Sequence, residues 1–308
     1  MKKKIYKVLS ILLTLAIVFS ACLCVFNTVS AAGEEQIYYV ASSGKDSNGG
    51  TTQLRPLKTL DKAIQKANDK GLDSDDIVIV KVLGTTNVSW AADDASKLTE
   101  HSFKLIVQSD NADGSAIIGT GAGIHMGGDT EFKNIGINFG SSNNYFFAKG
   151  NSVTFGQGTR YVGNTSMSAF YGGGNNSTYL NVTNKPYTLI SEIPIKGFSV
   201  TNQFSAITHN ADINVVYNAG TGTPRFAFGK SNGQSTFNAA LNFVVKSAAS
   251  VEFNCAGVDN TAFGENGYMQ ILNHTATEVT AAEGTDLARV PSDKLWVLNN
   301  KLQASSIF

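Results

Sequence analysis

Cysteine is scarce in this sequence. Two of its three cysteines, Cys22 and Cys24, lie in the apolar segment at the start of the chain, and only Cys255 follows it. An intramolecular disulfide is therefore excluded beyond that segment. Small extracellular domains commonly depend on disulfides, but a chain of this length can bury a sizeable core. We expect a protein stabilised by its own core, with Cys255 as a buried apolar side chain.

A strong charge of either sign is also missing. The chain has 24 basic and 24 acidic side chains, and four of the lysines lie within residues 1–32, which contain no acid. The remainder thus has 20 basic and 24 acidic groups, a net charge of −4. This balance is too mild to indicate a nucleic acid or an anionic membrane surface as partner.

Metal-binding patterns are absent as well. The four histidines are scattered singly, without the spacing of a zinc site, at positions 101, 125, 209 and 274. Asp46, Asn48 and Gly50 copy part of a calcium loop, but Leu57 stands where that loop has its bidentate Glu. Because Asp and Asn also favour tight turns, we interpret this stretch as a turn and predict neither a metal nor another cofactor.

Residues 1–32 have the layout of a secretory signal peptide. Four lysines precede an apolar run from Val8 to Phe26, and small residues around Ser30 and Ala31 offer a cleavage site. The run is also long enough to be an uncleaved anchor, which would be the only membrane contact predicted. We expect a secreted or cell-surface protein, and the lysine-rich start together with the missing disulfides favours a bacterial one.

A single amphipathic helix is predicted behind the leader. Leu57, Leu60, Ile64 and Ala67 recur at helical spacing within residues 57–70. Pro56 suits a first helical turn, and Gly71 is a stop signal. The helix is expected to cap the open end of the strands that follow, because a stack of strands needs its end covered. An ordinary αβ unit of another fold is the alternative.

The rest of the chain is predicted to be β-structure. Short runs such as "DIVIVKVLG" and "TEFKNIGINFG" are rich in β-branched and aromatic residues and end at Gly, Asn, Ser or Asp. Such short runs with Asn and Gly at the bends favour a parallel β-helix, although no strict repeat is visible. We assign 33–72 to the first strand and capping helix, 73–185 to coils, and 186–308 to further coils and a C-terminal cap. A separate β-sandwich from residue 186 is the alternative for the last segment.

Chemistry-bearing residues are sparse within the coils. Glu131 and Lys133 flank Phe132 on one predicted strand and would project from the same face, so they are the candidate catalytic pair. The same pattern is typical of any half-buried strand, and no catalytic residue is assigned on it alone. Aromatic residues between 145 and 171 are expected mostly in the core, and an exposed one among them would suit a sugar-binding platform.

The segment 38–64, "YYVASSGKDSNGGTTQLRPLKTLDKAI", resembles the N-terminal segment of secreted right-handed parallel β-helix proteins of the pectate-lyase-like superfamily. The resemblance lies in Tyr-Val at 39–40, in Gly-x-Asp-x-Asn-x-Gly-Thr at 44–51, and in Pro-x-x-Thr-x-x-x-Ala at 56–63. Residues 130–174 are similar to coils of β-helix surface proteins from Gram-positive anaerobes. The resemblance implies an all-β, right-handed parallel β-helix with an N-terminal amphipathic capping helix.

Two functions are consistent with these observations. The first is a non-catalytic secreted or surface β-helix with a structural, adhesive or polysaccharide-contacting role, whose partner would be a polysaccharide or cell-wall glycan. The second is a polysaccharide lyase or glycoside hydrolase acting in a groove along the helix. If the chain is a lyase, the resemblance implies Ca²⁺ as its cofactor, and no cofactor is expected otherwise. A hydrolase needs two carboxylates flanking the scissile bond. The few acids in the coils favour the first function.

Overall fold

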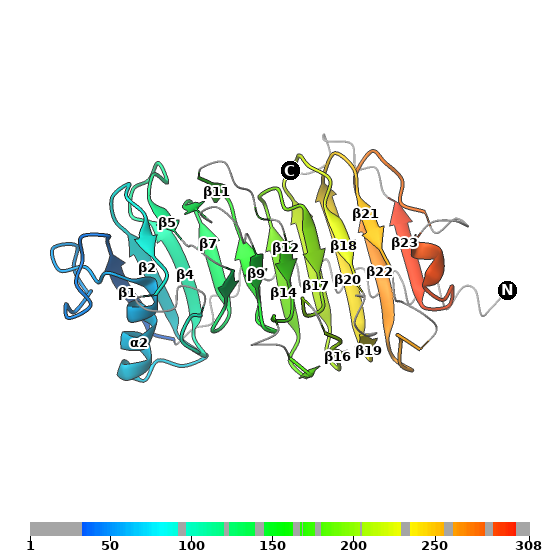
Figure 1. Cartoon of the computed structure of the whole chain (residues 1–308), viewed down its shortest axis with the longest axis horizontal. Coiled ribbons are helices and arrows are strands. Elements are labelled where there is room, and N and C mark those ends of the chain that lie inside the picture. Colours follow the sequence, from blue (N-terminus) through cyan, green and yellow to red (C-terminus); the bar gives the residue numbers. More distant parts are fainter. Residues whose placement is uncertain are drawn as a thin grey trace. The chain divides into compact units, whose positions relative to one another are not determined.

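The computed structural model shows an all-β solenoid of parallel strands, as the sequence predicts, with one α-helix among the residues that it describes (Figure 1). The solenoid belongs to a compact unit that begins at Glu35. The structure describes residues 33–91, 97–119, 123–138, 145–162, 167, 169–175, 180–203, 205–228, 235–255, 261–280 and 286–299. The predicted leader lies outside these residues. Within them, no helix has the length and apolarity that a membrane span requires.

Sheet A is the longest sheet and contains ten strands in purely parallel pairing. Its strands are, in spatial order, β1 (Glu35–Val40), β2 (Ile77–Val82), β4 (Lys104–Ser109), β7 (Thr130–Lys133), β10 (Val153–Phe155), β14 (Tyr187–Ser191), β17 (Ile213–Asn218), β20 (Ala240–Ser247), β22 (Tyr268–Asn273) and β23 (Leu295–Asn299). The same sheet thus continues from β14 to β23, beyond residue 186. Each strand adds one layer to the stack, so residues far apart in sequence become neighbours along the sheet.

Three shorter parallel sheets close the coils. Sheet B consists of β3 (Val88–Ser89), β5 (Ile117–Gly119), β8 (Gly136–Asn138) and β11 (Arg160–Tyr161). Sheet C consists of β6 (Ile124–His125), β9 (Tyr145–Phe147), β12 (Ala169–Tyr171), β15 (Gly197–Ser199), β18 (Arg225–Ala227) and β21 (Glu252–Asn254). Sheet D consists of β13 (Val182–Thr183), β16 (Thr208–His209) and β19 (Thr236–Phe237). A short 3₁₀ helix, η1 (Asp286–Arg289), precedes β23.

The helix α2 (Leu60–Lys70) starts three residues later than the predicted stripe. Thr59 is its N-cap, in an extended conformation, and Gly71 ends it with a left-handed φ of +83°. Leu57 therefore does not lie on the helix but forms a parallel bridge with Val40, where it is fully buried. The buried face of α2 includes Leu60 and Ile64 and packs against β1 and β2.

The interior is filled by stacked aromatic side chains. Phe132 is fully buried between its outward neighbours on β7, as the alternating pattern predicts. Phe146 lies edge-to-face against Trp90, Phe132, Phe155 and Phe170, with ring centroids 4.9–6.3 Å apart. Such contacts between successive coils stabilise the stack, and Cys255, the cysteine among the described residues, is free.

Candidate functional site

The turn motif at residues 44–51 has a structural role. Oδ1 of Asp46 accepts hydrogen bonds from the backbone N–H groups of Lys58 (2.9 Å) and Thr59 (3.2 Å), at the start of α2. The Asn48 amide donates to the carbonyl of Pro56 at 2.8 Å. These contacts are those of a turn, as the sequence indicates. Among the described residues, no three His, Cys, Asp or Glu side chains gather as a metal site requires.

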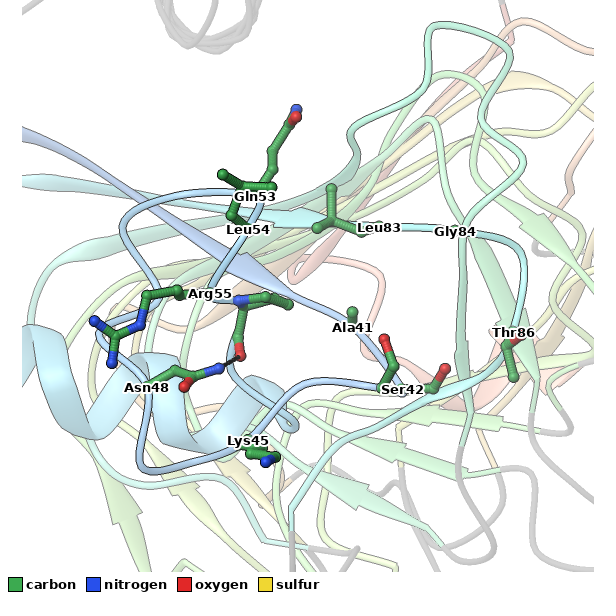
Figure 2. A pocket seen from close by; sticks show the side chains of 12 residues that line it. Ala41, Ser42, Lys45, Asn48, Gln53, Leu54, Arg55, Leu83, Gly84 and Thr86 are labelled. Atoms are coloured by element: carbon green, nitrogen blue, oxygen red, sulfur yellow. Dashed lines mark hydrogen bonds between the residues drawn. The ribbon is translucent and has the colours of Figure 1, made fainter.

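The same motif builds one wall of an open cleft with a volume of about 750 Å³, which we call the corner cleft (Figure 2). Three segments surround it: residues 41–48, residues 53–56, and residues 83–86 beyond β2. Its lining is mainly polar, with the cations Lys45 and Arg55, the hydroxyls of Ser42, Ser43 and Thr86, and the amides of Asn48 and Gln53.

Lys45 and Arg55 are the charged groups of the corner cleft, and its lining contains no carboxylate. Neither of these cations has an ion-pair partner among the described residues. The nearby Asp110 carboxylate is instead bound by Lys81 (3.5 Å) and by the Gln53 amide (2.7 Å). Two such cations beside hydroxyl and amide groups form a surface suited to an anionic, hydroxyl-rich ligand.

A second cleft, of about 560 Å³, lies beside His101, and we call it the His101 cleft. His101 donates a hydrogen bond from Nδ1 to the Phe103 carbonyl at 3.0 Å, while its Nε2 is buried without a partner. Burial lowers the pKa of this imidazole, which is therefore neutral at pH 7. Lys149, which also lines the cleft, adopts a left-handed φ of +55° and pairs with the exposed Glu100 at 3.5 Å.

The predicted pair Glu131 and Lys133 projects from the outer face of β7, as expected from alternation. Glu131 pairs with Lys104 of the neighbouring strand at 3.1 Å, and Lys133 is solvent-exposed. Neither residue lines the corner cleft or the His101 cleft. Asp129, another acid of this region, is held by Lys185 (3.1 Å) and by the backbone N–H of Ser152 (2.8 Å).

The aromatic residues singled out in the sequence are mainly interior. Phe146, Phe147 and Phe170 are buried, whereas Tyr145 is half-buried. Burial raises the pKa of Tyr171 to about 12, so its hydroxyl is not a base at neutral pH. Cys255 is fully buried, and burial raises the pKa of its thiol to about 12, which makes it inert as a nucleophile.

An outward aromatic pair that the sequence does not single out lies on β22 and β23. Tyr268 and Trp296 are half-buried, and their ring centroids are 5.0 Å apart at an interplanar angle of 84°. Burial raises the pKa of Tyr268, and the Asp212 carboxylate adds to this rise. Alternation in "GYMQILNH" and "KLWVLNN" places each ring on an outward position, but only the strand register brings the two together.

No protein-family model, curated protein or solved structure matches this chain.

Proposed function

We propose that this chain is a secreted or cell-surface β-helix protein that contacts polysaccharide without cleaving it. The pectate-lyase-like resemblance and the leader support a place outside the cell. The observation that carries the proposal is the corner cleft, where Lys45 and Arg55 have no carboxylate partner among the described residues and share the lining with hydroxyl and amide groups. Such a surface attracts the carboxylate, sulfate or phosphate groups of an acidic polysaccharide, and its neutral groups suit sugar hydroxyls.

The distribution of the acids supports a contacting rather than a hydrolytic role. A hydrolase places two carboxylates on either side of the scissile bond, within about 10 Å of each other. Here Asp46, Asp110, Asp129 and Glu131 are each engaged by a cation or by backbone N–H groups, and no Asp or Glu lines the corner cleft.

The test measures binding of the full chain to a polysaccharide panel by affinity electrophoresis and calorimetry. We expect an acidic polymer such as polygalacturonate to bind, with an affinity that falls as salt rises. Lys45→Ala combined with Arg55→Ala should lower the affinity at least tenfold. The matched control, Lys196→Ala with Arg225→Ala, removes the same two charges from exposed positions elsewhere and should have little effect. Equal losses in both variants, or no binding polysaccharide at all, would overturn the proposal.

The second candidate function is a polysaccharide lyase, and the His101 cleft favours it. A lyase removes the proton beside a sugar carboxylate, which needs a neutral base and a cation nearby. His101 is a neutral imidazole, and Lys149 supplies a cation from a strained backbone position. Because Nε2 of His101 is shielded from solvent, contact without cleavage is the function that the geometry supports best.

The two functions are separated by the soluble products. The full chain is incubated with the same polysaccharides, with and without Ca²⁺, and the supernatant is analysed by mass spectrometry. Unsaturated oligosaccharides that disappear in His101→Ala and Lys149→Ala would establish the lyase. Binding without any product would support the contacting role.

A further inference from the structure

Strands β17, β20, β22 and β23 are the last four strands of sheet A (Figure 1). Their outer face carries a row of neutral polar and aromatic side chains. Met269 and Ile271 on β22 point into the core, so Tyr268 and Gln270 point outward. Leu295 and Val297 pack against the core, so Trp296 points outward as well.

The strand register brings this row together. Asn214, Asn242, Gln270 and Trp296 occupy the same ladder position on four successive strands. Tyr268 lies on the same face, two positions before Gln270, and its ring meets Trp296 edge-to-face. Neighbouring strands are about 4.8 Å apart, so the row presents one group per strand along the solenoid axis.

One atom of the row lacks a hydrogen-bond partner. The Asn242 amide donates to Oδ1 of Asn214 at 2.9 Å, but its own Oδ1 is buried and accepts no hydrogen bond. Asn242 is only 7% exposed, so the unpaired oxygen lies in a site of low dielectric. An unsatisfied buried acceptor of this kind is costly, and a donor from a ligand would remove the penalty.

From these observations we propose that Asn214, Asn242, Gln270, Tyr268 and Trp296 form a binding site for a neutral pyranose chain, running along the solenoid axis. Aromatic rings pack against the apolar C–H face of a pyranose, and amide groups exchange hydrogen bonds with its hydroxyls. Oδ1 of Asn242 is closed to solvent in the free chain, so a sugar hydroxyl satisfies it only if the side chain turns outward on binding. Extended chains of pyranose units repeat at a length close to the strand spacing, so successive units can meet successive strands.

The charges at and beside the site favour a neutral sugar over an anionic one. None of the five residues is charged, and the nearest acid in the register, Asp212, lies one position before β17 and accepts the N–H of Ala240 at 2.9 Å. Its negative charge opposes a uronate at this place. The inference deepens the proposed contact with polysaccharide but concerns a different ligand class and a different part of the sheet from the corner cleft.

Tryptophan fluorescence can detect a ligand at this site, because one of the two tryptophans of the chain belongs to the row. Trp90 is fully buried in the core, whereas Trp296 belongs to the row. The full chain is titrated with cellohexaose, mannohexaose and xylohexaose, and with hexagalacturonate as the anionic probe. We expect at least one neutral hexaose to shift or quench the tryptophan emission, and Trp296→Phe to abolish this optical change.

Calorimetry with the same hexaose completes the test. Trp296→Ala and Gln270→Ala should each lower the affinity at least tenfold, and Trp296→Phe, which keeps a ring, should lower it less. Gln270→Ala leaves both rings in place, so its affinity for the hexaose still tests the proposal if Trp296→Ala does not fold. If no neutral hexaose binds, if both alanine variants bind normally, or if hexagalacturonate binds best at Trp296, the proposal is wrong.

The two proposals fail separately. Loss of acidic-polymer binding in the Lys45 and Arg55 variant concerns the corner cleft, whereas loss of neutral hexaose binding in Trp296→Ala concerns the row. Each variant is therefore also tested with the other ligand, for which we expect an unchanged affinity.

Discussion

Replacing Asp46 with alanine tests whether the most distinctive motif of this chain is a structural turn. The carboxylate accepts two backbone hydrogen bonds, from Lys58 at 2.9 Å and from Thr59 at 3.2 Å, just before α2. The variant removes the acceptor of both hydrogen bonds while the two donors stay in place. Helix α2 would then lose the support of the segment that leads into its N-cap.

The expected loss follows from these contacts. A hydrogen bond to a charged group contributes about 1.5–3 kcal/mol, and loss of a helix N-cap costs about 0.5–2 kcal/mol. Asp46 is half-buried, so water replaces part of what is lost. We expect Asp46→Ala to lower the free energy of unfolding by about 2 kcal/mol. Asp46→Asn keeps a neutral acceptor and should cost about half as much.

The assay is urea unfolding followed by the emission of Trp90, in a Trp296→Phe background. Trp90 reports on this region because its carbonyl accepts a hydrogen bond from the N–H of Asp61 at 2.7 Å, in the first turn of α2. Asp69→Ala, on the exposed side of the same helix, is the matched control and should change stability little. The midpoints are measured with Ca²⁺ and with EDTA.

Two results would refute the structural interpretation. If Asp46→Ala is no more destabilising than Asp69→Ala, the two hydrogen bonds do not support the fold. If Ca²⁺ stabilises the wild type but not Asp46→Asn, the motif binds the metal, and the turn interpretation is wrong.

Three further predictions concern the core and the outer face. Phe146→Ala should lower the free energy of unfolding by about 3–5 kcal/mol and change the Trp90 emission, because four rings lose a neighbour. Phe146→Leu should lower it less, and equal losses of the two variants in urea unfolding would contradict the packing. Burial lowers the pKa of His209 to about 3, so below pH 6.5 the unfolded chain binds more protons than the folded chain. The free energy of unfolding should therefore decrease as pH falls from about 6.5 towards 3, by up to about 1.4 kcal/mol per pH unit. His209→Gln should flatten this dependence in unfolding measurements at several pH values. Glu131→Gln should change the thermal unfolding midpoint little, because its partner Lys104 is 48% exposed and such pairs contribute less than about 1 kcal/mol; a large decrease would show that the pair is structural.

The sequence predicts the class of the fold because local patterns determine it. Alternation around Phe132 places this ring inside and its neighbours outside, and Gly71 ends α2 as expected. The helix begins three residues after the start that the sequence predicts, because Leu57 fits the helical spacing equally well. Its backbone instead continues the pairing with Val40, a contact between segments that spacing cannot reveal.

The candidate sites could not be predicted because they depend on the strand register. The chain has no strict repeat, and the number of residues from one layer of sheet A to the next varies. Ser152 is hydrogen-bonded to Asp129, which lies 23 residues before it, and to Thr188, which lies 36 residues after it. Without that register, Tyr268 and Trp296 are two aromatic residues in separate strands, and His101 and Lys149 are unrelated positions. The sequence alone could pair Glu131 with Lys133 only because the two residues share one strand.

The separation of the two proposed contacts has a consequence for the kind of ligand that binds best. Sheet A places β17, the first strand of the row, five strand spacings from β2, which corresponds to about 24 Å. A hexaose that occupies the row does not reach the corner cleft, whereas a long polysaccharide with neutral and acidic stretches can contact both. Linked contacts raise the overall affinity through effective concentration. A polymer of that type should therefore bind more tightly than its fragments, and this advantage should disappear when either Trp296 or the Lys45 and Arg55 pair is removed.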